Sequence, residues 1–314
     1  MRTITLTYPH TFSGEKLPET AAAIGFFDGI HKGHQKVINT AVTQARQSNS
    51  ESAVITFHPD PSSVLKNDGQ QVQYITPLAE KQQILQELGV DRLYIITFDK
   101  TLASLDPQAF IDHFIIQLNI KHLAAGFDFS YGHKGKGNAG TLEDHSRGAF
   151  DVTIIEQVTS DEQKISSTRI RELLQSGNLE EANRLLGRTL SVRGTVKKGD
   201  ERGRSIGFPT ANLDISSDAL LPKVGVYAVK VVWQNNIYEG MANLGYNPTF
   251  TADRNEPIVE VNIFDYNKDL YGEELVLEWH HYVRDEVKFD TREELIEQME
   301  KDETAIRHFF YHER

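Results

Sequence analysis

Apolar positions follow one pattern in the first half of the chain and another in the second. In the first half, short apolar runs alternate with longer segments in which apolar residues recur every three or four positions. The short runs predict strands at residues 1–7, 21–24, 52–57, 92–98, 122–127 and 152–156. The longer segments predict helices at 35–44, 77–88 and 107–118. This alternation predicts an α/β domain, a parallel sheet with helices on both faces.

The second half begins with helical sequence and continues with closely spaced short strands. The helical part covers residues 168–186, with a break at 176–178. Strands are predicted at 191–197, 226–233, 237–243, 258–265 and 274–283. Their spacing and turn glycines predict a small antiparallel barrel. A helix at 291–310 follows, with Thr291 and Glu294 placed to form a capping box. We expect two domains, 1–186 and 187–314.

Composition and charge narrow the class of protein. The 314 residues are 39% hydrophobic and 25% charged, which is typical of a globular protein, and no apolar run is long enough to span a bilayer. The first residues lack the apolar core of a signal peptide. The absence of cysteine excludes disulfides, thiolate catalysis and zinc–cysteine sites, and we expect a cytoplasmic protein. A net charge of −12 argues against binding long nucleic acids, but a small nucleotide remains possible.

Residues 25–34 carry the strongest chemical signal, the sequence Gly-Phe-Phe-Asp-Gly-Ile-His-Lys-Gly-His. They follow a predicted strand and precede a predicted helix, so His31 and His34 lie where backbone N–H groups and the helix dipole favour an anion. Gly33 lets a ligand approach the backbone. This combination suits a phosphate whose charge grows during reaction. The alternative is a pair of surface histidines that only make local hydrogen bonds.

A second anion site is indicated at residues 165–171, Ile-Ser-Ser-Thr-Arg-Ile-Arg. Ser and Thr are common helix caps, so capping alone is one interpretation. Arginines in a first turn oppose the helix dipole by roughly 0.3–1 kcal/mol each, and a bound anion reverses that sign.

Two further segments follow predicted strands and therefore lie at the same edge of the sheet. They are Phe57-His58-Pro59-Asp60-Pro61 and Gly126-Phe127-Asp128-Phe129-Ser130-Tyr131-Gly132, and each could be only a turn. Residues 135–140 match Gly-x-Gly-x-x-Gly, but they do not occupy the first strand–helix turn and no clear helix follows. We interpret them as a mobile, basic loop over the site. The chain has no Walker A motif.

The histidine turn resembles the nucleotidyltransferase superfamily, whose members transfer AMP or CMP from a nucleoside triphosphate. The resemblance implies an α/β Rossmann-like nucleotidyltransferase domain in which His31 and His34 contact the triphosphate and stabilise the transition state. The second anion site resembles the second signature of these enzymes, which grips the β- and γ-phosphates. The resemblance places these residues at ATP: Gly25, Phe27, Asp28, Asp128, Ser167, Thr168 and Arg169. It also implies that Phe57, His58 and Pro59 hold the flavin, because the segments after the strands resemble prokaryotic FAD synthetases.

Residues 199–212 form the other informative stretch, in which glycines and arginines precede Pro209-Thr210-Ala211-Asn212. Thr210 and Asn212 share a face in an extended segment, and magnesium prefers such hard oxygen ligands. A plain hairpin with turn glycines is the alternative. Glu260 lies between two valines and so points away from them in a strand, where it is either a base or a solvent-facing residue.

The order of motifs in the second half resembles riboflavin kinase throughout. They are residues 204–212, 225–228, 243–249, 259–262 and 269–272. The resemblance implies a β-barrel riboflavin kinase domain with a C-terminal helix. It assigns magnesium and ATP to Thr210 and Asn212, the ribityl 5′-hydroxyl to Glu260 as base, and flavin also to Arg284. It places the remaining ATP contacts at Gly203, Arg204, Gly207 and Pro209.

With both halves together, nearly the whole chain resembles the bacterial riboflavin kinase/FAD synthetase family. This implies phosphorylation of riboflavin to FMN and then adenylylation of FMN to FAD, with Mg2+ as cofactor and ATP as co-substrate. We expect only small-molecule partners (riboflavin, FMN and ATP), no nucleic acid and no membrane, in a monomer or weak homo-oligomer. Two alternatives are an FAD synthetase with a decayed kinase domain and a flavin-binding regulator without turnover.

Overall fold

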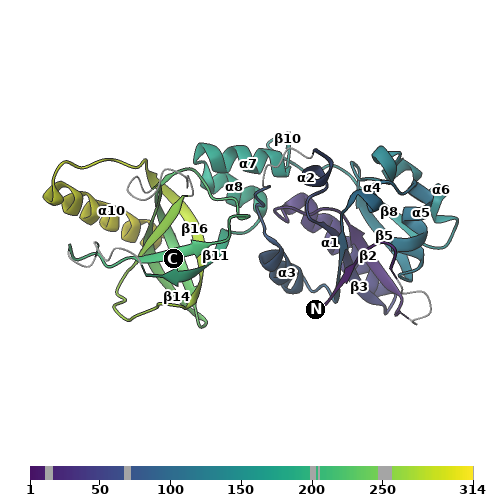
Figure 1. Ribbon diagram of the computed structural model, residues 1–314, viewed down its shortest axis with the longest axis horizontal. Coiled ribbons are helices and arrows are strands. Elements are labelled where there is room, and N and C mark those ends of the chain that lie inside the picture. Colours follow the sequence, from purple (N-terminus) through teal and green to yellow (C-terminus); the bar gives the residue numbers. More distant parts are fainter. Residues whose placement is uncertain (11–16, 67–71, 199–202, 204–205, 247–256, 314) are drawn as a thin grey trace. The chain divides into compact units, whose positions relative to one another are not determined.

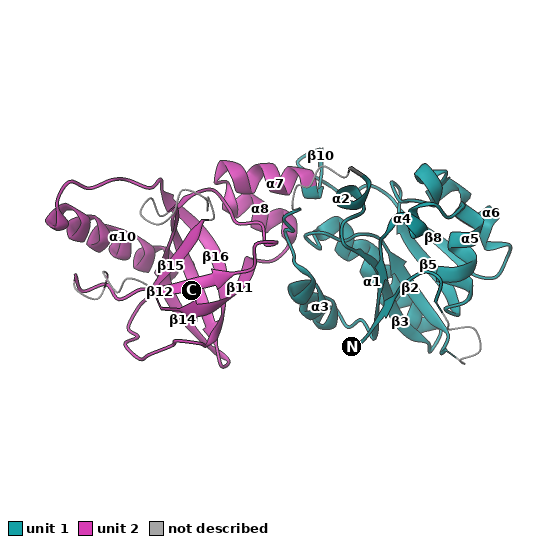
Figure 2. Ribbon diagram, in the orientation of Figure 1, with its two compact units in different colours: residues 1–167 teal, residues 168–314 magenta. Residues whose placement is uncertain are grey.

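The chain forms two compact units, Met1–Ser167 and Thr168–Arg314, which Figure 2 colours separately. The computed structural model describes residues 1–10, 17–66, 72–198, 203, 206–246 and 257–313. Within these ranges, no helix combines the length and the apolar character needed to cross a membrane. The predicted domain boundary after residue 186 lies 19 residues beyond the division between the compact units (186 − 167). As a functional boundary it stays a prediction.

A six-stranded parallel sheet with the strand order β1-β4-β3-β2-β5-β8 forms the centre of unit 1 (Figure 1). The strands are β1 Arg2–Leu6, β2 Thr20–Ile24, β3 Glu51–His58, β4 Arg92–Thr97, β5 Ile120–Gly126 and β8 Asp151–Ile155. The innermost part of the sheet is β2, whose five residues are all buried. The predicted parallel α/β architecture is confirmed.

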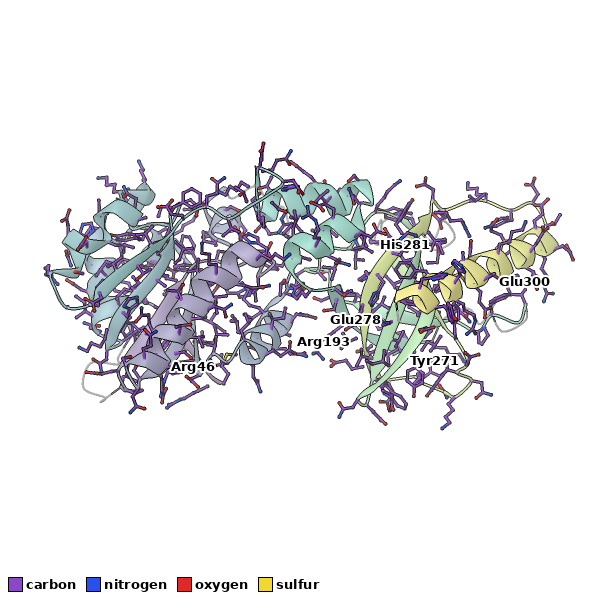
Figure 3. The ribbon with its side chains drawn as sticks, turned by 180° about the vertical axis from the view of Figure 1, so that it is seen from behind. Arg46, Arg193, Tyr271, Glu278, His281 and Glu300 are labelled. Carbon is purple, nitrogen blue, oxygen red and sulfur yellow. The ribbon has the colours of Figure 1, made fainter. Side chains whose placement is uncertain are left out.

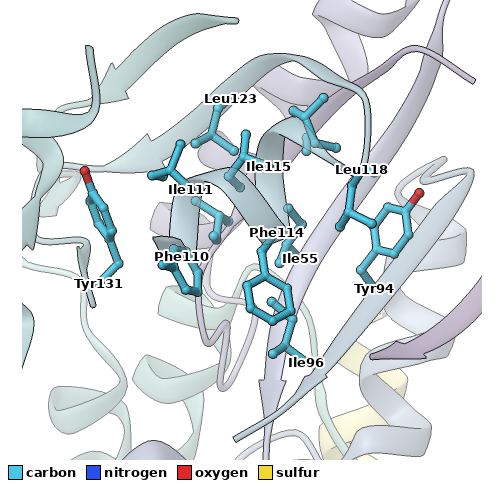
Figure 4. Close-up of a cluster of buried hydrophobic side chains, with 14 of the residues drawn as sticks. Ile55, Tyr94, Ile96, Phe110, Ile111, Phe114, Ile115, Leu118, Leu123 and Tyr131 are labelled. Atoms are coloured by element: carbon cyan, nitrogen blue, oxygen red, sulfur yellow. The ribbon is translucent and has the colours of Figure 1, made fainter. Parts of the chain in front are cut away.

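Helices cover both faces of this sheet because successive residues of a strand point to opposite sides. On one face, Ala22 and Ile24 of β2 join a cluster formed mainly with α5 Pro107–Ile111 and the π-helix η1 Asp112–Ile116. Figure 4 shows Phe114 of this cluster beside Ile96 of β4. On the other face, Ala23 packs with α1 Lys32–Gln47 and α3 Leu78–Glu87.

Two local predictions differ from the structure of unit 1. Helix α1 begins at Lys32, three residues earlier than predicted, because His31 caps it. The glycine-rich segment 135–140 is not an open loop: β7 Gly137–Asn138 pairs with β6 Ser130–Tyr131, and Asn138 and Thr141 form a capping box around a 3-10 turn, Ala139–Thr141. The five-residue helix α6 Leu142–Ser146 follows it.

Unit 2 contains a helix pair, a closed antiparallel barrel and a long C-terminal helix. The helices are α7 Ser167–Ser176, which starts one residue before the unit, α8 Leu179–Leu186 and α10 Arg292–Glu313. The barrel order is β11-β12-β15-β14-β13-β16. Its strands are β11 Leu190–Lys197, β12 Ala211–Ile215, β13 Gly225–Trp233, β14 Asn236–Gly245, β15 Ile258–Ile263 and β16 Glu274–Arg284. The predicted barrel is confirmed; β12 was expected only as an extended segment.

Helix α10 packs against the outside of the barrel. Ile306 and Phe310 of α10 bury themselves against Val226, Ala228 and Met241 of β13 and β14. The exposed Glu300 lies on the same helix, and Figure 3 shows it together with Glu278 and Arg193 of the barrel strands. At its start, Glu294 N–H donates to Thr291 Oγ1 at 3.2 Å, whereas the Glu294 carboxylate accepts from Asp290 N rather than from the cap residue. The predicted capping box is therefore half formed.

Candidate active sites

A cavity of about 830 Å³ lies in unit 1, at the carboxyl ends of the parallel strands. This is the edge where ligands bind in open α/β sheets. Among the residues predicted to bind ATP or flavin, the following line it: Gly25, Phe27, Asp28, His34, Phe57, Asp128 and Ser167. His31 is buried behind His34, with 5% of its surface exposed. The structure therefore brings these predicted residues together within one unit.

The two histidines lie together in a geometry that the sequence does not specify. His31 is the N-cap of α1, and its Nδ1 accepts a hydrogen bond from the backbone N–H of His34 at 3.2 Å. The two rings stack with centroids 3.6 Å apart and planes inclined by 16°. Because Nδ1 of His31 is an acceptor, its neutral form carries the proton on Nε2. His31 can therefore donate a hydrogen bond from Nε2 while it caps the helix.

Both imidazoles are neutral at physiological pH. Burial lowers the pKa of His31 to about 4, although a backbone hydrogen bond and the charge of Asp128 act in the opposite direction. Burial also lowers the pKa of His34 well below its usual 6.5, with help from the charges of His31, Lys81 and Lys164. A neutral imidazole still has one ring N–H, which can donate a hydrogen bond. An incoming polyphosphate would raise both pKa values because it favours the charged form.

The turn between β2 and α1 has a strained backbone held by side chains. Phe27 and Ile30 have positive φ angles of 54° and 41°, which are uncommon for residues other than glycine. The carbonyl of Ile30 accepts from Gln35 Nε2 at 2.8 Å. The Asp28 carboxylate accepts from Thr76 N at 3.1 Å. These bonds fix the backbone in front of the histidine stack.

Ser167 also holds this turn, and its hydroxyl donates to the Asp28 carbonyl at 2.8 Å. The two segments predicted to bind ATP, residues 25–34 and 165–171, are thus joined through this bond within unit 1. Thr168 and Arg169 belong to unit 2. There, Arg169 forms an ion pair with Glu181 of α8 at 3.0 Å.

Asp128 has a cationic partner beside the histidines. Lys164, on the short strand β10 Gln163–Lys164, forms an ion pair with the Asp128 carboxylate at 2.7 Å. The same ammonium lies 4.7 Å from the centre of the Phe127 ring. The charge of Lys164 therefore offsets that of the Asp128 carboxylate, so this part of the cavity can accept an anion.

Part of this cavity is aromatic; Phe57, Phe129 and Tyr131 belong to the segments expected at this edge of the sheet, whereas Phe98 and Phe110 were not predicted. Its rings come from Phe57, Phe98, Phe110, Phe129 and Tyr131. Phe129 and Tyr131 stack with their centroids 5.6 Å apart. The position of these rings next to strand ends was the available signal, but the sequence does not reveal that they converge. His58 and Pro59 are not among the lining residues, and the His58 ring lies 6.0 Å from that of Tyr74.

Unit 2 has its own cavity of about 370 Å³, on the outer surface of the barrel beside α10. Asn212, Glu260 and Asn243 are directly opposite one another on the neighbouring strands β12, β15 and β14. Opposed residues of antiparallel neighbours point to the same face, and all three line this cavity. Val259 and Val261, the neighbours of Glu260, are buried at 1% and 0% exposure. Glu260 therefore faces the cavity rather than the barrel core.

The oxygen atoms of Thr210 and Asn212 suit magnesium if phosphates and water complete its coordination. Both residues line the cavity, as the two-residue spacing predicts. No cluster of three or more His, Cys, Asp or Glu side chains suited to a metal occurs in the described parts of the chain. Such a donor set fits an ion that arrives with a nucleotide, because Mg2+ is usually held by few protein ligands together with substrate phosphates.

The remaining predicted kinase residues fall into three groups. Gly203 and Arg284 line the cavity. Gly207 and Pro209 do not, although the Pro209 carbonyl accepts from Asn262 Nδ2 at 2.8 Å and so joins the segment to β15. Arg204 lies outside the described residues.

Helix α10 completes the wall of this cavity through residues that the sequence did not indicate. Met299 and Asp302 line it, and Asp302 is 3% exposed. The Asp302 carboxylate accepts from Arg284 Nε at 3.0 Å and from Gln298 Nε2 at 2.8 Å. Arg284 is thus fixed between the end of β16 and α10. The sequence spacing of 18 residues gives no sign of this pairing.

Comparisons with known proteins match both halves of the chain. A family model described as FAD synthetase matches residues 14–169, and one described as riboflavin kinase matches residues 186–310. A protein of Bacillus subtilis (strain 168), named bifunctional riboflavin kinase/FMN adenylyltransferase, is 46% identical over 98% of this chain and 98% of its own length. A protein of the same name from Listeria monocytogenes is 46% identical over 99% and 98%.

A solved structure has the same fold over nearly the whole length. It comes from Streptococcus pneumoniae and is titled a macrolide-efflux protein. It has a TM-score of 0.89 and 38% identity, and the match covers 98% of this chain and 99% of that one. Its title differs from the names of the other relatives. The two family models, which together match most of the chain, decide between the descriptions.

Proposed function

The chain belongs to the bifunctional riboflavin kinase/FMN adenylyltransferases, and from this premise we propose which of its residues carry each reaction. It is a transferase of flavin cofactor biosynthesis. The kinase transfers the γ-phosphate of ATP to riboflavin and yields FMN. The adenylyltransferase then joins AMP from a second ATP to FMN and releases pyrophosphate.

Adenylyl transfer occurs in the cavity of unit 1. The FMN phosphate oxygen attacks the α-phosphorus of ATP, and the bond between the α-phosphorus and the bridging oxygen breaks. His31 and His34 stabilise the charge on the phosphates as neutral hydrogen-bond donors, which suits their lowered pKa values. Ser167, which lines this cavity, binds the β- and γ-phosphates. For Thr168 and Arg169 the same role rests on the family resemblance alone. The aromatic part of the cavity accepts the flavin ring system.

Riboflavin phosphorylation occurs in the cavity of unit 2. Glu260 accepts the proton of the ribityl 5′-hydroxyl as that oxygen attacks the γ-phosphorus of ATP. The bond between the γ-phosphorus and the β,γ-bridging oxygen breaks, and ADP leaves. Thr210 and Asn212 would hold Mg2+, which would neutralise charge on the phosphates. The strand register supports this arrangement because it aligns Asn212 and Glu260 on one face.

The observation that carries these assignments is the presence of two separate cavities with different chemistry. One contains the histidine stack and an aromatic wall, and the other contains a polar row centred on Glu260. Two sites in two units imply that each reaction can be removed by itself.

The experiment is a pair of variants assayed for both reactions with magnesium and ATP. Glu260→Gln should abolish conversion of riboflavin to FMN but retain conversion of supplied FMN to FAD. His34→Ala should do the reverse. If either variant lost both reactions while its circular dichroism spectrum stayed native, the assignment to separate sites would be wrong.

Three broader statements also belong to the proposal. We place the functional boundary after residue 186, at the start of the matched riboflavin kinase region. We propose that the enzyme acts on small molecules alone, as a monomer or weak homo-oligomer. We propose the cytoplasm as its location, where its substrate ATP is abundant.

A further inference from the structure

A buried lysine lies directly behind the adenylyltransferase turn and takes no part in the proposed chemistry. Lys81 of α3 is 4% exposed, although lysine is almost never buried without a partner. Its Nζ donates to the Phe26 carbonyl at 2.7 Å and lies 4.7 Å from the centre of the Phe26 ring. Burying an ammonium ion costs free energy, so its presence at this position calls for a reason.

The turn that Lys81 contacts is the one that carries the proposed catalytic groups. Phe26 is followed directly by Phe27, whose φ is positive, and by Asp28, which lines the cavity. The Phe26 carbonyl also accepts from Thr56 Oγ1 at 2.9 Å. Loss of Lys81 would therefore leave this carbonyl with a partner, and the fold would not acquire an unsatisfied buried acceptor.

The charges around Lys81 connect it to the histidine stack. Among the described residues, the charged or titratable groups that face it are Asp28 on the turn, Asp60 after β3 and His34 on α1. The two carboxylates favour the ammonium form of Lys81. That ammonium in turn disfavours a proton on His34, because like charges repel.

We propose that Lys81 is a positioning residue for adenylyl transfer, whose buried ammonium group fixes the Phe26 carbonyl and with it the turn that precedes the histidine stack. It acts through the turn rather than by touching substrate. The proposal rests on the placement of ATP beside His31 and His34 given above.

The proposed role of Lys81 depends on its ammonium charge, so adenylyl transfer should depend on pH. Burial lowers the pKa of Lys81 to about 8, against the opposing effect of Asp28 and Asp60. The ammonium is present below that pH and is lost as the pH rises through it. Bound ATP adds negative charge nearby and moves the loss upward. Adenylyl transfer should therefore decline on the alkaline side of pH 8, whereas riboflavin phosphorylation in unit 2 should not follow the same curve.

The first test compares Lys81→Met with Lys121→Met in the full chain. Methionine keeps the length of the side chain without its charge, and Lys121 is an exposed residue of β5 that serves as the matched control. We expect Lys81→Met to lower kcat for FAD formation from FMN by about 10- to 100-fold, the effect of a small misplacement of catalytic groups. KM for ATP should change much less. Riboflavin phosphorylation by the same samples should stay within about twofold of the wild type, which shows that unit 2 is unaffected. Hydrogen exchange of the α1 amides reports whether unit 1 keeps its fold.

The second test needs no variant and so does not depend on folding. The rates of FAD formation and of riboflavin phosphorylation are measured in the wild type from pH 7 to about 9.5, a range chosen to span the lysine titration. ATP and magnesium are common to both reactions, so at saturating concentrations their own titrations affect both rates alike. The ratio should fall as one proton is lost, and Lys81→Arg, which stays charged, should remove that fall.

Two results would overturn the proposal. One is a native-like Lys81→Met enzyme whose FAD formation stays within about twofold of the wild type. The other is a constant ratio of the two rates across the alkaline range. Neither result would touch the assignment of the histidines, because His34→Ala is expected to lose FAD formation at every pH.

Discussion

At the scale of single residues, His31 has two roles, and both require that its Nδ1 stays unprotonated. As an N-cap it must offer a lone pair to a backbone N–H, which it does through Nδ1. As a buried ring stacked on His34 it must remain uncharged. A proton on Nδ1 would remove the cap and place a charge in the stack. The folded state therefore resists protonation of His31, and this resistance links stability to pH.

The substitution His31→Asn tests this link. The pKa of His31 is lowered from 6.5 to about 4 by burial, so the unfolded chain binds more protons between these values and unit 1 loses stability as the pH falls through that window. Between pH 7 and pH 5, His31 should account for about 2 kcal/mol of this loss. Asparagine keeps the cap but does not titrate, so the variant should lose less stability over the same interval.

The measurement must report on unit 1 alone, because Trp233 and Trp279 both belong to unit 2. Hydrogen exchange of the α1 amides at the two pH values satisfies this condition. An equal change in protection for the wild type and His31→Asn would show that His31 titrates normally in the folded protein.

At this scale, the sequence allowed site residues to be predicted only where they lie together in a short motif. His31 and His34 could be selected because both stand in one contiguous run with its glycines. Lys81 could not, because an isolated lysine in a helix is expected at the surface and its partner Phe26 lies 55 residues away. Asp302 was missed for the same reason. Side chains that act through tertiary contacts leave no local pattern.

At the scale of elements, the start of α1 depends on a glycine within the helix. A Cβ at Gly33 would lie 3.1 Å from two atoms of the His31 ring, which is closer than ordinary van der Waals contact. Glycine is otherwise unfavourable in a helix by about 1 kcal/mol relative to alanine. The glycine therefore lowers the intrinsic stability of α1, but it leaves room for the His31 ring over the first turn of the helix.

Gly33→Ala should separate these two effects. We expect FAD formation to fall about tenfold as the His31 ring is displaced. The stability of α1 should stay unchanged or rise. Thr40→Ala is a matched control, since it raises helix propensity in the same helix away from the histidines. Steady-state kinetics with FMN and hydrogen exchange of α1 give the two readouts. Full activity in Gly33→Ala would show that FAD formation does not require the observed position of the His31 ring.

Helix α10 depends on a buried ion pair with the end of β16. Asp302→Asn leaves the Arg284 guanidinium without its carboxylate, and breaking a buried pair costs about 3 kcal/mol or more. Asp265→Asn breaks the pair of Asp265 with Arg307, which is exposed, and should cost less than about 1 kcal/mol. Denaturant unfolding followed by the fluorescence of buried Trp279 should show this difference. Similar midpoints for the two variants would contradict a structural role for Asp302.

Periodicity revealed most of the elements but not their irregularities. Five buried residues in β2 and regular apolar spacing in α1 identify a strand and a helix. The π-helix at Asp112–Ile116 and the short strand β12 were not predicted. The π-helix has the apolar spacing of a continuing α-helix. The strand β12 becomes a strand only because β11 and β15 pair with it.

At the scale of the whole molecule, the open question is where one unit ends and the other begins. The family models leave residues 170–185 unmatched, and this interval contains most of α7 and α8. Helix α8 packs on β11 and β16 of the barrel. Its residues Leu179, Ala182, Leu185 and Leu186 are each 0% exposed. Sequence similarity and packing thus divide the chain at different places.

Asn183 shows why the packing boundary should govern stability. Its amide donates to the Trp279 carbonyl at 2.9 Å and accepts from Leu190 N at 2.8 Å, so it joins α8 to two barrel strands. A fragment of residues 187–314 would lose these bonds and expose apolar surface of the barrel that α8 covers. Each buried leucine contributes about 1.5–3 kcal/mol, so the loss of α8 removes several such contributions.

Two fragments, 168–314 and 187–314, test this boundary. We expect 168–314 to fold, to phosphorylate riboflavin and to bury Trp279 as in the full chain. The shorter fragment should melt about 10 °C lower or more, because a loss of several kcal/mol shifts the midpoint of a domain of this size by that amount. Thermal unfolding followed by tryptophan fluorescence measures both. Equal midpoints would mean that the helix pair is a linker and that the division after residue 186 is the structural one. A lower midpoint for 187–314 would show that α8 is part of the folded kinase domain, although only its last residue, Leu186, lies in the matched kinase region.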